Sequence, residues 1–131
     1  MKTIDEIKQK IRDVKFTESF DMIVAIANGG IVPAAMLAQI LQVDVQLLKI
    51  NWRNAKQQPQ YEAPQLLAPV NFNYRGKNIL LVEDRVKTGA TLNFAKQMLQ
   101  QEAKQVKTFA VNGPADYSLY NETCFKFPWL L

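Results

Sequence analysis

The segment from Ile79 to Leu92 constrains the fold of this chain more than any other part of its sequence. It opens with four apolar residues, Ile-Leu-Leu-Val, continues with the adjacent acids Glu83 and Asp84, and then reaches a Thr-Gly-Ala-Thr turn. A continuous apolar run of this length is typical of a strand that is buried on both faces of a parallel sheet. The segment therefore predicts a buried strand, a tight turn and the start of a helix.

The same segment predicts a binding site. Ligands of open α/β sheets bind beyond the carboxyl ends of the strands, where Glu83 and Asp84 lie. The turn at residues 88–91 offers backbone N–H groups, two hydroxyls and a helix N-terminus, which together suit a phosphate. Because carboxylates accept hydrogen bonds from sugar hydroxyls, we interpret the acids and the turn together as a ribose-phosphate site.

Strand and helix patterns alternate along the rest of the chain. Strands are predicted at residues 22–27, 43–50, 78–83 and 106–111, and helices at residues 3–15, 33–41 and 91–101. This alternation predicts an α/β fold with a mainly parallel, twisted sheet flanked by helices and joined by right-handed crossovers. We expect residues 1–131 to form a single domain, with a short aromatic tail at residues 117–131.

Residues 51–77 have a different composition. They contain Pro59, Pro64 and Pro69 together with many Gln and Asn residues, and they show no firm periodicity. A long loop in a compact domain is more often functional than accidental, so this segment is a candidate lid.

Composition excludes several kinds of chemistry. The chain has no histidine and one cysteine, which excludes Ser-His-Asp and Cys-His catalysis, the common zinc sites and an intrachain disulfide framework. The net charge of +4 suits a polyanionic small molecule, and the basic residues do not form a run with interleaved aromatics as in many nucleic-acid-binding proteins. No segment matches a membrane span or a signal peptide, so we expect a cytoplasmic protein that binds neither nucleic acid nor membrane.

The acids and the turn, taken together, resemble the type I phosphoribosyltransferases. The signature of that family is an apolar strand, two acids, a short spacer and a Thr-Gly-x-Thr phosphate loop, and the fourteen residues from Ile79 to Leu92 fit it here. The length, the long loop and the closing Phe127-Pro128-Trp129 are most similar to short xanthine-guanine and hypoxanthine members. The resemblance implies that Glu83 and Asp84 hold the ribose and are the catalytic residues. It assigns the 5′-phosphate to Lys87, Thr88, Gly89, Ala90 and Thr91, and a Mg²⁺ ion to Asp84.

A second segment resembles the pyrophosphate loop of the same family. A strand ends there in Asn28, Gly29 and Gly30, and glycines let backbone N–H groups approach a diphosphate closely. Asn28 stands where many relatives carry Arg or Lys, so this loop offers hydrogen bonds without a positive charge. Arg53 and Lys56 are candidate cations of the long loop.

The base end departs from the family pattern. Lys87 stands where purine-using relatives have an acid, Val111 where they have a lysine, and Cys124 where they have a stacking aromatic. Within a small C-terminal hood, Phe125 is the candidate ring for the base, and Val111 marks the other base-binding position.

These features leave two functions open. The first is a phosphoribosyltransferase that transfers the 5-phosphoribosyl group from phosphoribosyl pyrophosphate to a purine-like base and releases pyrophosphate. The alternative is a non-catalytic or regulatory module that binds phosphoribosyl pyrophosphate or a nucleotide and has lost normal base recognition. By analogy with the family, we expect a homodimer or a higher homo-oligomer.

Overall fold

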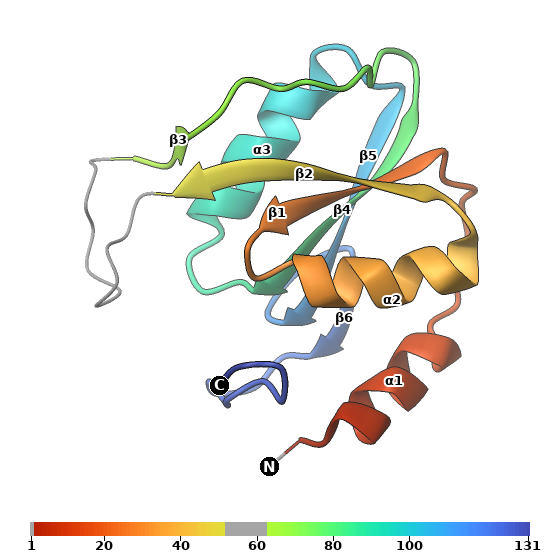
Figure 1. Cartoon of the computed structure of the whole chain (residues 1–131), viewed down its shortest axis with the longest axis vertical. Helices are drawn as coiled ribbons and strands as arrows, with labels where there is room; N and C mark the ends of the chain where they lie inside the picture. The colour runs from red at the N-terminus through yellow and green to blue at the C-terminus, as the bar shows by residue number, and fades with distance from the viewer. Residues whose placement is uncertain (1, 52–62) are drawn as a thin grey trace.

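The structure is a computed structural model, and it describes residues 2–51 and 63–131. Within these residues a six-stranded sheet has the strand order β3-β2-β1-β4-β5-β6 (Figure 1). The strands are β1 (Met22–Ala27), β2 (Asp44–Asn51), β3 (Gln65–Leu66), β4 (Asn78–Arg85), β5 (Gln105–Asn112) and β6 (Tyr117–Tyr120). All neighbouring pairs are parallel except β2 and β3, which are antiparallel.

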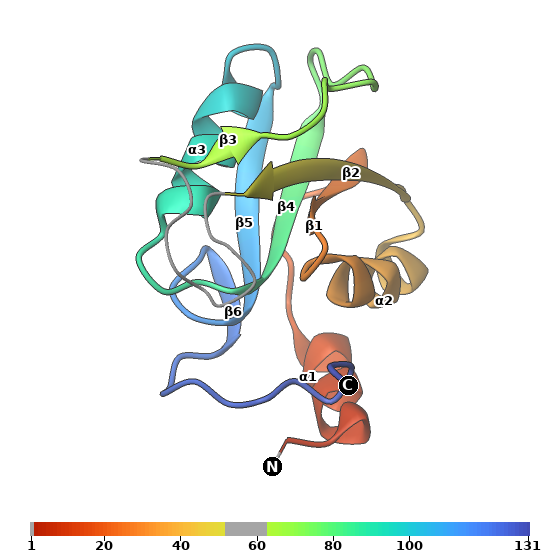
Figure 2. The same ribbon diagram turned by 60° about the vertical axis from the view of Figure 1, so that its left-hand side comes forward.

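Helices cover both faces of the sheet. The helices are α1 (Ile4–Asp13), α2 (Ile31–Leu41) and α3 (Ala90–Gln100). Figure 2 shows α3 on one side of the sheet, with α2 on the other side and α1 below it. The predicted α/β fold, with a mainly parallel sheet flanked by helices, is therefore confirmed.

Strand β4 lies at the centre of the sheet and is buried on both faces. Ile79 and Leu81 pack with the core residues of α3, whereas Leu80 and Val82 pack with those of α1 and α2. All four side chains are fully buried. This double burial explains why the strand is continuously apolar until Glu83, where the covering layers end.

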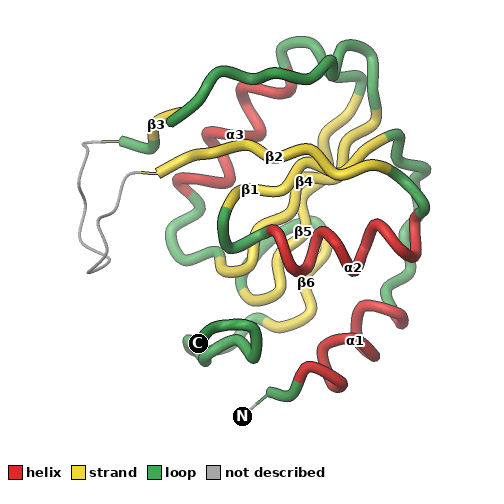
Figure 3. Tube along the Cα trace, in the orientation of Figure 1, coloured by secondary structure: helices red, strands yellow, loops and turns green. Residues whose placement is uncertain are grey.

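The register of the parallel strands brings three strand ends to the same edge of the sheet. Ala25 of β1 lies opposite Val82 of β4, and Arg85 of β4 lies opposite Asn112 of β5. The loops that follow β1 and β4, drawn in green in Figure 3, consequently lie next to each other. This edge is where open α/β sheets bind their ligands.

The elements differ from the predictions in a few places. Strand β4 extends to Arg85, two residues beyond the predicted end at residue 83, so Asp84 lies within the strand together with Glu83. The tail was expected to be an aromatic segment, but Tyr117–Tyr120 forms β6, an edge strand parallel to β5. The short β3 was not predicted, because its two paired residues have no periodicity to detect. Among the described residues, every helix is too short or too polar to cross a bilayer.

Candidate functional site

The acids of the opening motif lie in the last residues of β4 and are partly buried. Each carboxylate accepts a hydrogen bond from the backbone of the following residue. The distance is 3.0 Å from Asp84 N to Glu83 Oε1 and 2.6 Å from Arg85 N to Asp84 Oδ1. The remaining oxygen lone pairs can accept hydrogen bonds from a ligand.

The carboxylate of Asp84 influences the ionisation of Glu83. Burial raises the pKa of Glu83 well above its usual value, and the neighbouring Asp84 charge raises this pKa further. Two adjacent carboxylates in a partly desolvated site resist carrying two negative charges at once. The site therefore favours ligands that bring donor hydroxyls or a cation.

The loop between β4 and α3 has the geometry of a phosphate-binding turn. Gly89 has φ +84°, in the left-handed region that favours glycine, and forms the N-cap of α3 without a side-chain cap. The hydroxyl oxygen of Thr88 accepts a hydrogen bond from Ala90 N at 3.2 Å, which stabilises the turn. The helix N-terminus thus presents backbone N–H groups that an anion can bind. Lys87 and Thr88 are exposed beside it.

The loop after β1 packs directly against the acids. A Cβ atom on Gly29 would lie 2.5 Å from the Asp84 carboxylate, and one on Gly30 would lie 2.4 Å from the Val82 carbonyl oxygen. Both distances are shorter than real Cβ contacts: at Gly30 the neighbour is backbone, so glycine is required there, whereas at Gly29 a Cβ atom would displace the Asp84 side chain. Asn28 is exposed at the tip of the loop, and its peptide bond with Ala27 is cis. The fold therefore brings together the two motifs that the sequence places over fifty residues apart.

The next residue of β4, Arg85, contacts the C-terminal segment, which we define as residues 121–131. Its Nη2 donates a hydrogen bond to the Phe125 carbonyl oxygen at 2.5 Å, and its Cζ lies 4.9 Å from the centre of the Phe127 ring. Sequence reasoning missed this role, because the partners are 40 residues away and no local pattern marks them. The only available signal was the position of Arg85 directly after the two acids.

The two residues predicted for the base end lie in different surroundings. Phe125 is half-buried and packs edge-on against Tyr120 and Phe127, at ring-centre distances of 5.3 and 5.2 Å. Val111 is fully buried in the core beside Phe109, so its side chain offers no surface to a base. We therefore correct the expectation for Val111: this position of β5 faces the interior of the domain. Cys124 is exposed and free.

Three further predictions concern a cation and the long loop. Among the described residues there is no cluster of three or more His, Cys, Asp or Glu side chains. Asp84 and Glu83 supply hard oxygen donors, which suit Mg²⁺ when substrate oxygens complete its shell. Arg53 and Lys56 lie outside the described residues.

Comparisons with known proteins agree with this geometry. The family model described as the phosphoribosyl transferase domain matches residues 1–126. A xanthine-guanine phosphoribosyltransferase from Nitratidesulfovibrio vulgaris strain DP4 is 33% identical over 116 residues, which are 82% of this chain and 67% of that protein.

Solved structures have the same fold. The crystal structure of a purine phosphoribosyltransferase from Pyrococcus horikoshii has a TM-score of 0.81 at 23% identity, covering 97% of this chain and 90% of the other. A hypothetical protein from Neisseria gonorrhoeae with bound ppGpp has a TM-score of 0.76 at 23% identity, covering 97% of this chain and 86% of the other.

The fold and the edge of the sheet define an α/β protein in which a glycine loop and an acidic strand end lie side by side, next to a helix N-terminus. Together with the family match, this assigns the class. The chain belongs to the phosphoribosyl transferase domain family.

Proposed function

We propose that this chain transfers the 5-phosphoribosyl group of phosphoribosyl pyrophosphate to a nitrogenous, purine-type base and releases pyrophosphate. One observation carries the proposal: the backbone of Gly29 lies against the carboxylate of Asp84. This contact puts the glycine loop after β1 next to the acidic pair of β4, and the N-terminus of α3 follows that pair in the chain. The relatives named xanthine-guanine phosphoribosyltransferase support a purine acceptor.

In this proposal each part of the site binds one part of the substrate. The backbone of residues 88–91 and the hydroxyls of Thr88 and Thr91 bind the 5′-phosphate. Glu83 and Asp84 accept hydrogen bonds from the ribose hydroxyls. The backbone of residues 28–30 binds the pyrophosphate, and Asn28 adds a side-chain hydrogen bond.

The reaction is a displacement at C1 of the ribose. The bond from C1 to the pyrophosphate oxygen breaks, its electron pair leaves with pyrophosphate, and a ring nitrogen of the base bonds to C1. Positive charge develops on the ribose in the transition state, and the carboxylates of Glu83 and Asp84 are placed to stabilise it. Holding the donor and the base together supplies the rest of the acceleration, so no histidine or cysteine nucleophile is needed.

We propose Mg²⁺ as the cofactor. Asp84 would hold it, and Glu83 is the second available carboxylate. Held there, Mg²⁺ would supply positive charge that offsets the negative charge of the leaving pyrophosphate.

Calorimetry and a turnover assay test the proposal. Phosphoribosyl pyrophosphate should bind in the presence of Mg²⁺, and Asp84→Asn should weaken this binding. Asp13→Asn, which changes an exposed acid at the end of α1, is the matched control and should leave binding unchanged. Pyrophosphate release is then measured with guanine, xanthine, hypoxanthine and adenine. If neither phosphoribosyl pyrophosphate nor any nucleoside monophosphate binds, the proposal is wrong.

A second candidate function is a nucleotide-binding module without turnover. It is supported by the base end, where Lys87 is exposed in place of an acid and Val111 is buried in the core, so that neither offers the usual hydrogen bonds to a purine. Tight nucleotide binding together with no pyrophosphate release from any base would favour this module over the enzyme.

Assembly and location are also proposals. We propose a homo-oligomer, which is supported by the exposed apolar side chains Ile31, Ile40 and Leu47 on α2 and β2. Analytical ultracentrifugation tests it, and a monomer at micromolar concentration would contradict it. A cytoplasmic location is supported by the single free cysteine, Cys124, since disulfide frameworks are the rule in small secreted domains.

A further inference from the structure

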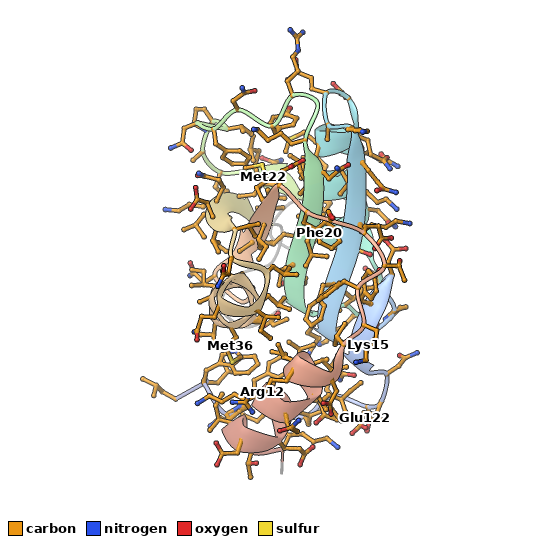
Figure 4. The ribbon with its side chains drawn as sticks, turned by 90° about the vertical axis from the view of Figure 1, so that its right-hand side faces the viewer. Arg12, Lys15, Phe20, Met22, Met36 and Glu122 are labelled. Carbon is orange, nitrogen blue, oxygen red and sulfur yellow. The ribbon has the colours of Figure 1, made fainter. Side chains whose placement is uncertain are left out.

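Three side chains from different parts of the chain hold the C-terminal segment in place. Arg85 of β4 donates to the Phe125 carbonyl oxygen. Asn112 of β5 donates to the Glu122 carbonyl oxygen at 3.2 Å and accepts from Glu122 N at 3.0 Å. Lys2 forms an ion pair with Glu122 at 3.0 Å, and Figure 4 shows Glu122 beside α1. The segment is therefore anchored at two strand ends and at the N-terminus.

Arg85 differs from the other two anchors because it also contacts the aromatic rings of the segment. Its guanidinium lies over Phe127, and Phe127 is stacked on Trp129 with a ring-centre distance of 4.9 Å and an interplanar angle of 7°. A guanidinium suits this place because it is planar, always charged, and able to stack and donate at the same time. Its Nε is buried and has no hydrogen-bond partner among the described residues, so the side chain is held through Nη2 and the ring.

Arg85 also connects the segment to the acidic pair. Its backbone N–H donates to the Asp84 carboxylate, while its side chain donates to the Phe125 carbonyl oxygen. One residue thus links the ribose-binding carboxylate to the segment that contains the candidate base-facing ring, Phe125.

We propose that Arg85 is a positioning residue that fixes the C-terminal segment at the acidic strand end and thereby sets how tightly the base end of a ligand is held. This inference rests on the proposed function, since it requires a ligand with a sugar end and a base end. Arg85 acts through the segment, and it leaves the sugar and the phosphate to Glu83, Asp84 and the loop after them. Removing it should weaken base-dependent binding and leave sugar-phosphate binding intact.

The test compares Arg85→Met, which keeps the length of the side chain without its donors, with Arg85→Lys, which keeps the charge. Arg75→Met is the matched control, because Arg75 lies before β4 with 81% of its side chain exposed. All variants are made in a Trp52→Phe background, which leaves Trp129 as the single tryptophan of the chain. Affinities for guanosine monophosphate and for ribose 5-phosphate are measured by calorimetry with Mg²⁺, and Trp129 emission and thermal unfolding are recorded.

We expect Arg85→Met to weaken guanosine monophosphate binding by about tenfold, the usual effect of losing one charge-assisted hydrogen bond. Ribose 5-phosphate affinity should stay within about twofold, because the phosphate loop is untouched. Trp129 emission should shift to the red and become easier to quench, because loss of the guanidinium over Phe127 exposes the stacked Phe127 and Trp129 rings to water. Arg85→Lys should restore part of the affinity, and Arg75→Met should match the parent chain.

Several results would overturn this inference. If Arg85→Met changes neither Trp129 emission nor guanosine monophosphate affinity, Arg85 does not position the segment. If it weakens both ligands equally, its effect is a general structural one. If Arg85→Met does not fold, the same criteria are applied to Arg85→Lys. A parent chain that binds guanosine monophosphate no more tightly than ribose 5-phosphate would overturn this inference alone, whereas a parent chain that binds neither phosphoribosyl pyrophosphate nor any nucleoside monophosphate would overturn the proposed function as well.

Discussion

The two ends of the candidate site are built in different ways. The sugar-phosphate end, Glu83, Asp84 and residues 87–91, lies in one short stretch of chain with local hydrogen bonds, from Asp84 N to Glu83 and from Ala90 N to Thr88. The base end is assembled from Arg85, Asn112 and the C-terminal segment, over separations of 10 to 40 residues. A local motif makes the first end, and tertiary contacts make the second.

This difference explains where the chain matches its family and where it does not. A continuous loop holds its shape through its own backbone, so a short stretch of sequence sets its phosphate-binding geometry. The base end depends on which side chains meet across the fold, so it can change without affecting the loop. The comparison therefore predicts that substitutions at the two ends have separable effects.

The largest expected effect is on the sugar-phosphate end. Asp84→Asn keeps the shape of the side chain but removes the charge that, in the proposed function, would stabilise the transition state and hold Mg²⁺. We expect kcat/KM to fall by about 100-fold or more in the pyrophosphate-release assay. A fall of less than about threefold would show that the acidic pair is not the reacting end of the site.

The second prediction concerns the contact between the two loops. The added methyl group in Gly29→Ala would meet the Asp84 carboxylate, which is a side chain and can move. We expect kcat/KM to fall by about 10- to 100-fold with little loss of thermal stability. Gly30→Ala meets the backbone carbonyls of Val82 and Ile26, which cannot move, so it should lower stability by about 1–3 kcal/mol instead. Equal effects of the two substitutions on stability would contradict this contrast.

The third prediction uses the ionisation of Glu83. Because burial raises the pKa of Glu83 in the folded chain above its unfolded value, this residue stabilises the fold below the unfolded pKa. That stability is lost as the pH rises through the folded pKa. Glu83→Gln cannot ionise, so it should melt a few degrees above the parent chain at pH 8. The difference should shrink toward pH 4, as measured by thermal unfolding across this range. A variant that is less stable than the parent at pH 8 would contradict the assigned direction.

The smallest expected effect comes from Asp116, which lies between β5 and β6 and accepts hydrogen bonds from Thr108. Burial alone would raise the pKa of Asp116, but hydrogen bonds from Thr108 N at 2.9 Å and Thr108 Oγ1 at 3.1 Å lower it overall. Because the pKa of Asp116 is lowered in the folded chain, Asp116 stabilises the fold at pH values above its unfolded pKa. That stabilisation is lost as the pH falls through the folded pKa. Because Asp116 is exposed, solvent screens its interactions, so Asp116→Asn should cost less than about 1 kcal/mol at pH 7, and this cost should diminish below pH 4. An effect on ribose 5-phosphate binding would contradict the separation of the two ends.

The sequence predicted the elements that carry strong local signals. The apolar run of β4, the helical spacing of Ile7 and Ile11 and the turn before α3 each determine their own structure, and all were located within a few residues. The edge strand β6 was missed because Tyr117–Tyr120 is short and aromatic, and only its pairing with Phe109 and its neighbours makes it a strand. Val111 was assigned to the base end by resemblance, but its side chain faces the core.

By itself, the sequence determined the α/β fold and proposed the sugar-phosphate end, because apolar periodicity and a continuous motif act over short stretches of chain. Only the tertiary structure decided that Gly29 lies against Asp84, that Val111 is buried, and that Arg85 holds the C-terminal segment. These are contacts between residues that are far apart in the chain, and the folded sheet register brings them together. For that reason the base end could be described only once the whole sheet was in place.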